Sequence, residues 1–282
     1  MDELEEKKKK KEVKEEKEEE EEGAKQQQQQ SHDPVVPFKA GSPMFIAGPS
    51  NSGKTFWVQN LLTNAQVMFD RPPTSITYCY SVYQPLYDSM KKTVPVPITF
   101  HEGLLTEKDF DQMTNENFHI IVLDDLMDKI VASKEMMELF TKYCHHKDIT
   151  AILITQNVFI QGVHSRTISL NSHVFVLFAN RRDEQQIMRL ARQFYPTEWK
   201  DFMSAYKDAT SEPFGYLIID ITPTHPRILQ LRTRIFPEEF PFVYSIAYSS
   251  TSSAARTTGA AVAVSGSNNI CPSDNTPAPA SS

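Results

Sequence analysis

An eight-residue segment in the first quarter of the chain combines two glycines, a lysine and a threonine at a fixed spacing. It reads Gly-Pro-Ser-Asn-Ser-Gly-Lys-Thr, follows the apolar run Met44–Ala47 and precedes Phe56–Leu62, whose apolar residues recur at helical spacing. Glycines permit a tight turn and a close approach of backbone N–H groups to an anion. Lysine adds a charge for phosphate, and the threonine hydroxyl can bind Mg²⁺. The pattern predicts a phosphate-binding loop (P-loop) formed by Gly48, Pro49, Ser50, Asn51, Ser52, Gly53, Lys54 and Thr55.

A pair of carboxylates follows a second apolar run, Ile120–Leu123. In P-loop triphosphatases, one acid at such a strand end lies near Mg²⁺ and a second acts on the attacking water. We therefore predict that Asp124 and Thr55 bind the metal and that Asp125 is the catalytic base. The alternative is that the two acids cap a helix starting near Leu126. Asp125 is shorter than the Glu usual at the base position, so its reach toward the water can require a water bridge.

A third apolar run, Ala151–Thr155, ends in the amides Gln156 and Asn157. In a parallel sheet such strand ends line the ligand crevice. We predict that Gln156 contacts the γ-phosphate or the attacking water, with Asn157 as the second candidate and simple turn closure as the alternative.

An arginine at the γ-phosphate stabilises transition-state charge and adds about three to five orders of magnitude in rate. The candidates are Arg166, Arg181 and Arg182, which all follow the third run at turns.

Short apolar runs alternate with segments of helical period, which predicts an α/β fold with helices covering a largely parallel sheet. The runs are nearly continuous in hydrophobicity, which favours strands buried on both faces. The predicted strands are Met44–Ala47, Ile76–Tyr80, Ile120–Leu123, Ala151–Thr155, Val174–Phe178 and Tyr216–Ile219.

Charge and composition divide the chain of 282 residues into three parts. Residues 1–33 form a Glu/Lys run followed by five glutamines, and residues 249–282 are rich in Ser, Thr and Ala. Both segments hold too little apolar surface to fold, so we predict disordered tails around a domain at 34–248. The net charge is −7, of which residues 1–22 contribute −5 through 12 acidic and 7 basic side chains. The domain is thus nearly neutral, so nucleic acid is neither implied nor excluded.

Cysteine content and hydropathy set the expected compartment. Cys79, Cys144 and Cys271 are widely spaced and odd in number, which fits neither a disulfide framework nor a zinc site. No run approaches the roughly 18–20 apolar residues that span a bilayer. We expect a soluble intracellular protein without a membrane partner.

The segments GPSNSGKT, IIVLDD and ILITQN, in this order and spacing over about residues 43–182, resemble the FtsK/HerA-like P-loop ATPases. The resemblance is to the poxvirus-type genome-packaging ATPases of large DNA viruses and of Maverick/Polinton elements. Longer stretches such as ITYCYSVYQPLYDSM are also similar to the packaging-ATPase-like proteins of such elements.

This resemblance implies a three-layer P-loop NTPase fold of the additional-strand class, in which the sensor strand lies between the two Walker strands. It also implies hydrolysis of ATP with Mg²⁺, a homo-oligomeric ring, double-stranded DNA as substrate and a capsid protein as partner. Such a protein would act in the host nucleus or a virus factory, or with the virion. Carried over by motif, Lys54 and Thr55 match Walker A, Asp124 and Asp125 match Walker B, and Gln156 matches the sensor; Arg166 is our choice of arginine finger.

Three other functions are compatible with a P-loop. A GTP-dependent switch would need an Asn-Lys-x-Asp motif for guanine, and the sequence has none. A small-molecule kinase would need an acceptor site, whereas two acids at a strand end fit attack by water better. An ATP-binding scaffold without DNA translocation remains open because Asp125 is short.

Overall fold

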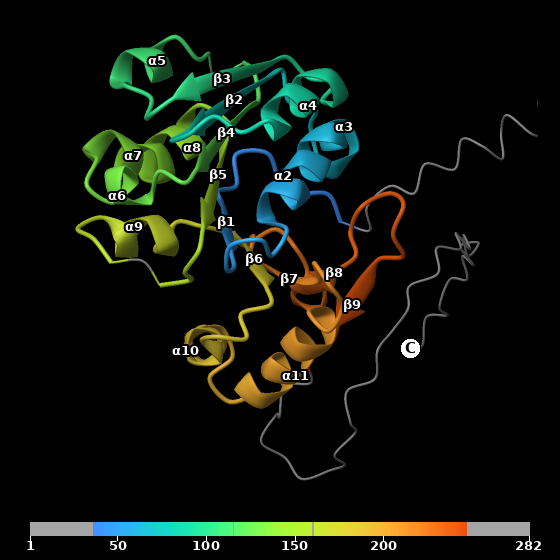
Figure 1. The fold of residues 1–282 in the computed structure, drawn as a ribbon. Coiled ribbons are helices and arrows are strands. Elements are labelled where there is room, and N and C mark those ends of the chain that lie inside the picture. The colour runs from blue at the N-terminus through green and yellow to red at the C-terminus, as the bar shows by residue number, and fades with distance from the viewer. Residues whose placement is uncertain (1–35, 115, 160, 247–282) are drawn as a thin grey trace, which may run out of the picture.

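The computed structural model describes residues 36–114, 116–159 and 161–246. These residues form a sandwich of three layers, with one mixed sheet in the middle and helices on both faces (Figure 1). The predicted α/β class and its three-layer arrangement are confirmed. The predicted disordered segments at 1–33 and 249–282 lie outside the described residues, so the domain boundaries stay a prediction.

The sheet has nine strands in the order β3-β2-β4-β5-β1-β6-β7-β8-β9. The six strands from β3 to β6 run parallel, and the last three pair antiparallel. The strand β5 therefore lies between β1 and β4, which is the placement of the sensor strand that the resemblance implied. The bounds are β1 (Met44–Ala47), β2 (Ser75–Tyr80), β3 (Ile98–Glu102), β4 (His119–Asp124), β5 (Ile149–Thr155), β6 (Val174–Phe178), β7 (Tyr216–Asp220), β8 (Leu231–Thr233) and β9 (Phe242–Tyr244).

The helices divide between the two faces of the sheet. The first three, α2 (Lys54–Thr63), α3 (Ala65–Met68) and α4 (Leu86–Thr93), cover one face. A larger set of helices, from α5 to α11, covers the other face. That set comprises α5 (Glu107–Asp111), α6 (Met127–Ile130), α7 (Lys134–Glu138), the π-helical turn η1 (Leu139–Tyr143), α8 (Cys144–His146), α9 (Ser165–Leu170), α10 (Glu184–Phe194) and α11 (Trp199–Ala209). A short 3₁₀ turn, η2 (Arg227–Leu229), precedes β8.

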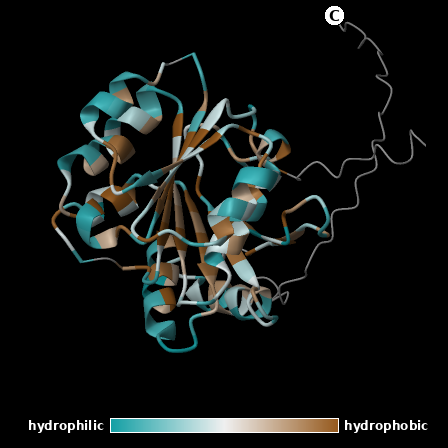
Figure 2. Ribbon diagram, turned by 45° about the horizontal axis from the view of Figure 1, so that its top comes forward, coloured by the Kyte–Doolittle hydropathy of each residue, from teal (hydrophilic) through white to brown (hydrophobic). Residues whose placement is uncertain are grey.

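Alternation along the strands decides which residues face which helices. In β4, Ile120 and Val122 pack in the core beneath α2 and α4, whereas Ile121 and Leu123 pack in the core on the opposite face. Figure 2 shows the apolar strands enclosed between helices whose outer surfaces are hydrophilic. By the same period of two, Asp124 projects to the face of α2. The strand pattern thus sets the side on which the acid at the end of β4 emerges.

Among the described residues, no helix combines the length and the hydropathy that crossing a bilayer requires. Cys79 and Cys144 are buried as free thiols, and Cys271 lies outside the described residues.

Candidate functional site

The loop between β1 and α2 has the backbone of an anion cradle. Asn51 and Gly53 have positive φ angles of 63° and 99°, and α2 begins at Lys54. The loop is fastened to the sheet where the N–H of Gly48 donates to the carbonyl of Thr155 at 3.3 Å. The N-terminal end of α2 therefore opens toward the loop, and its free N–H groups and dipole favour an anion there.

Both glycines are required by their surroundings. A Cβ on Gly48 would lie 2.7 Å from Cβ of Phe178, and one on Gly53 would lie 3.0 Å from Cδ1 of Phe214 in addition to opposing a φ of 99°. Separations near or below 3 Å require a neighbour to move. The predicted use of glycine for the close turn is thus matched by specific contacts at both ends of the loop.

Lys54 is folded over the loop. Its Nζ donates to the carbonyl oxygens of Gly48 at 2.7 Å and Pro49 at 2.8 Å. Burial lowers the pKa of Lys54 below its ordinary value, while the nearby charges of Asp124 and Asp125 act to raise it. The charges of Asp124 and Asp125 therefore lie near enough to Lys54 to act on its pKa.

Asp124 ends β4 and is only 5% exposed. Its Oδ2 accepts hydrogen bonds from the hydroxyls of Tyr78 at 2.7 Å and Tyr87 at 3.3 Å. Burial raises the pKa of the Asp124 carboxyl, and the two tyrosine hydrogen bonds oppose that shift. The sequence analysis missed both tyrosines, because aromatic residues in a strand or helix are typical of core packing.

Asp125 follows directly, is exposed and has a φ of 54°. The capping alternative for the acidic pair is wrong: Leu126 occupies the N-cap of α6, and no side chain caps that helix. Asp125 instead lies in a left-handed turn, which Asp tolerates better than most residues because its short side chain bonds locally. Its carboxylate is free of a structural role at the helix start and is accessible to water.

The other predicted residues follow other strands of the sheet or lie on α9. Gln156 is exposed and follows the end of β5, whose last residue pairs with Ala47 at the start of the loop. Arg181 and Arg182 follow β6, the parallel neighbour of β1 on its other side, so they lie at the same edge of the sheet. Arg166 is exposed on α9, and α9 packs on the π-helical turn η1. The roles of Gln156 and Arg166 stay predictions.

Thr55 and Asp124 fit a magnesium ion. They supply a hydroxyl and a carboxylate, which are the hard oxygen donors that Mg²⁺ prefers. Within the described part of the chain, no hydrogen bond goes to Oδ1 of Asp124, so one carboxylate oxygen is available. No group of three or more His, Cys, Asp or Glu side chains there is placed to hold a metal. A cation at this site would therefore share its coordination with water and phosphate, as is usual for Mg²⁺ with nucleotides.

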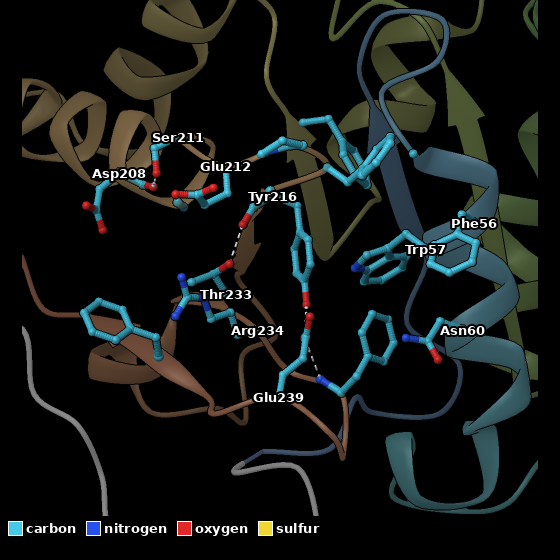
Figure 3. Close-up of a pocket in the computed structure, with 18 of the residues that line it drawn as sticks. Phe56, Trp57, Asn60, Asp208, Ser211, Glu212, Tyr216, Thr233, Arg234 and Glu239 are labelled. Carbon is cyan, nitrogen blue, oxygen red and sulfur yellow. Dashed lines mark hydrogen bonds between the residues drawn. The ribbon is translucent and has the colours of Figure 1, made fainter.

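A cavity of about 340 Å³ adjoins the loop at Gly53 and lies on the side of β6 and β7. Figure 3 shows Phe56 and Trp57 of α2 on one side of it, Asp208 and Glu212 on the opposite side, and Tyr216 between them. The sequence analysis did not identify this cavity. The residues that line it are Gly53, Phe56, Trp57, Asn60, Phe178, Asp208, Ala209, Ser211, Glu212, Pro213, Phe214, Gly215, Tyr216, Thr233, Arg234, Phe236, Glu239, Phe242 and Tyr244.

Hydrogen bonds hold the far wall of the cavity in place. The hydroxyl of Tyr244 donates to Asp208 at 2.7 Å, and that of Tyr216 donates to Glu239 at 2.9 Å. Phe214 is 66% exposed and has a φ of 63°, a conformation rare for a bulky residue. An exposed aromatic side chain thus lines the cavity beside Gly53.

Comparison with solved structures finds similar chains at low sequence identity. The genome packaging NTPase of Sulfolobus turreted icosahedral virus 2 with sulfate has a TM-score of 0.47 and 12% identity, covering 68% of this chain and 95% of that chain. The same viral protein with ATPγS gives a TM-score of 0.44 and 12% identity over 66% and 95% of the two chains. A flagellar accessory protein of Methanocaldococcus jannaschii gives 0.33 and 12% over 49% and 71%. No protein-family model matches the chain, and no curated protein matches it.

Proposed function

We propose that this protein is a Mg²⁺-dependent P-loop ATPase. The observation that carries the proposal is that the anion-shaped loop after β1 and the acids that end β4 emerge at the same edge of the sheet, since Ala47 pairs with Thr155 and Asp124 pairs with Ile154. A cradle for phosphate and a pair of acids in one site are what hydrolysis of a triphosphate needs. This arrangement needs no group other than water to receive the γ-phosphate.

Each residue has a distinct task in this proposal. Lys54, now bonded to two loop carbonyls, transfers its hydrogen bonds to the β- and γ-phosphate oxygens when the nucleotide binds. Asp125 accepts the proton of the attacking water, and Gln156 orients that water or the γ-phosphate. Mg²⁺, held through Thr55 and Asp124, would neutralise charge on the phosphates.

The cavity beside Gly53 is our proposed site for the nucleotide base and ribose. Its volume of about 340 Å³ is within the range of small-ligand pockets, and it begins where the phosphate loop ends. Base stacking on an aromatic side chain contributes about 1–3 kcal/mol. Phe214 and Phe56 are exposed aromatic residues in its lining, so they are available for such stacking.

We expect Phe214→Asn to weaken ATP binding roughly tenfold through the loss of stacking, about 1.4 kcal/mol. Asparagine tolerates the positive φ at this position, so the backbone is retained. Binding of tripolyphosphate, which has no base, should not change. Phe240→Asn is the matched control, because Phe240 is 81% exposed and lies outside the cavity lining. An equal loss for ATP and tripolyphosphate would place the base elsewhere.

We further propose that hydrolysis drives translocation of double-stranded DNA into a capsid by a homo-oligomeric ring, with Arg166 as the arginine finger. The support is the order and spacing of GPSNSGKT, IIVLDD and ILITQN, which resemble the poxvirus-type packaging ATPases and those of Maverick/Polinton elements. In such a ring an exposed arginine such as Arg166 would act on a neighbouring subunit's nucleotide.

The test of translocation is the response of ATP turnover to DNA. We expect double-stranded DNA longer than a few helical turns to raise the steady-state rate several-fold at low salt, and the increase to fade as salt screens phosphate contacts. Turnover that never responds to duplex DNA would remove the translocase proposal and leave an ATPase switch or scaffold.

A further inference from the structure

Two tyrosine hydroxyls from different elements converge on one oxygen of Asp124. Tyr78 lies in β2 and Tyr87 in α4, and their hydroxyls lie 2.7 Å and 3.3 Å from Oδ2 of Asp124. Both side chains are almost completely buried, with 0% and 1% exposure. We call these two residues the tyrosine pair.

Packing alone accounts for the rings of the pair but not for their hydroxyls. The two rings lie 5.0 Å apart, and each also packs on Phe100, at 5.4 Å from Tyr78 and 5.1 Å from Tyr87. Phenylalanine would make the same ring contacts. A buried hydroxyl without a partner costs free energy, so its placement reflects the acceptor it meets. For both hydroxyls that acceptor is the carboxylate of Asp124.

The hydroxyls are fixed as donors. An ionised carboxylate oxygen only accepts hydrogen bonds, so the hydroxyls of Tyr78 and Tyr87 both donate to Oδ2 of Asp124. Two donors on Oδ2 restrict rotation of the carboxyl group about its last torsion, which is otherwise broad.

We propose that Tyr78 and Tyr87 are positioning residues that hold Oδ2 of Asp124 so that Oδ1 remains for the magnesium ion. The inference rests on the proposed function, because it concerns the same metal and nucleotide. Partners of this kind that orient a metal ligand typically change metal affinity about 10–100-fold when removed. The two tyrosines fix the orientation of the Asp124 carboxylate as a metal ligand. Neither tyrosine contacts the nucleotide in the proposal.

The neighbouring Tyr83 provides a matched control. It belongs to the same aromatic cluster, with its ring 5.3 Å from that of Tyr87, but its hydroxyl donates to Asp88 at 2.6 Å. Tyr83 is also 42% exposed. Tyr83→Phe thus removes a hydroxyl from the same aromatic cluster but leaves both hydrogen bonds to Asp124 in place.

The experiment measures binding of a fluorescent, slowly hydrolysed ATP analogue to the full chain while Mg²⁺ is titrated. In EDTA we expect equal affinity in the parent, Tyr78→Phe, Tyr87→Phe and Tyr83→Phe. With Mg²⁺ we expect the half-saturating concentration to rise about tenfold in Tyr78→Phe, where the bond is shorter, and less in Tyr87→Phe. Tyr83→Phe should match the parent. Turnover at saturating Mg²⁺ should recover most of the parent rate in both variants.

The outcomes separate the two levels of inference. An unchanged Mg²⁺ requirement in both variants, with nucleotide binding intact, would overturn the role of the tyrosine pair and leave the ATPase proposal standing. A parent chain that binds no nucleotide with or without Mg²⁺ would overturn both. Thermal unfolding of each variant is recorded as a control for stability. Loss of packing would lower nucleotide affinity in EDTA as well, so a change confined to the Mg²⁺ titration supports the positioning role.

Discussion

Lys54→Ala is expected to lose most of its affinity for ATP. The Nζ of Lys54 donates two hydrogen bonds, now to the carbonyls of Gly48 and Pro49, which we propose are redirected to phosphate oxygens in the complex. Hydrogen bonds to charged groups contribute about 1.5–3 kcal/mol, which corresponds to a loss of about tenfold to more than a hundredfold. Equilibrium titration with ATP and Mg²⁺ measures the change.

The fold itself should survive this substitution. Lys54 is the first residue of α2, and alanine is a good helix former at that position. Thermal unfolding should therefore stay close to that of the parent. Lys92→Ala, which removes an exposed lysine from the last turn of α4, is the control for loss of one positive charge. Equal ATP affinity in Lys54→Ala, Lys92→Ala and the parent would contradict the role of the loop.

The central strands of the parallel part of the sheet could be predicted from the sequence because they are buried on both faces. The runs at β1, β4, β5 and β6 are continuous apolar segments, and the structure places each of them as predicted or extends it by one or two residues. Burial on two faces leaves little room for polar residues, which makes such strands conspicuous.

In two of the missed strands, β3 and β8, this signal is broken, and the third, β9, has only three residues. The edge strand β3 reads ITFHE and is only partly buried, so polar residues interrupt it. In β8, Arg232 is buried at 3% exposure and pairs with Asp220 of β7. A charged residue argues against a core strand unless its partner is known. That partner becomes visible only once β7 and β8 are paired.

The candidate site likewise has features that the sequence predicted and features that it did not. A local motif revealed Lys54 and the loop, because eight consecutive residues carry the whole pattern. The bond from Tyr78 to Asp124 spans 46 positions and exists because β2 and β4 pair in parallel. The cavity beside Gly53 is assembled from α2 and from segments between Phe178 and Tyr244, which the antiparallel strands bring back to the loop. No short segment of the sequence carries a pattern that would predict the hydrogen bond or the cavity.

Asp125→Asn is expected to keep ATP binding and to lose turnover. The amide has nearly the same shape as the carboxylate but cannot accept the proton of the attacking water, and general-base catalysis contributes about 10²–10⁴-fold. Affinity should stay the same or rise slightly, because a negative charge beside the phosphates is removed. Single-turnover hydrolysis at saturating ATP separates the two quantities.

The backbone makes asparagine the informative replacement at this position. Asp125 has a φ of 54°, which Asn adopts readily and Ala does not, so Asp125→Asn isolates the loss of the base from strain in the turn. Asp128→Asn makes the same chemical change three residues later, on the exposed first turn of α6, and should retain the parent rate. If Asp125→Asn and Asp128→Asn both hydrolyse ATP as fast as the parent, Asp125 is not the base. Asp124 is then the only acid of the pair that takes part in hydrolysis.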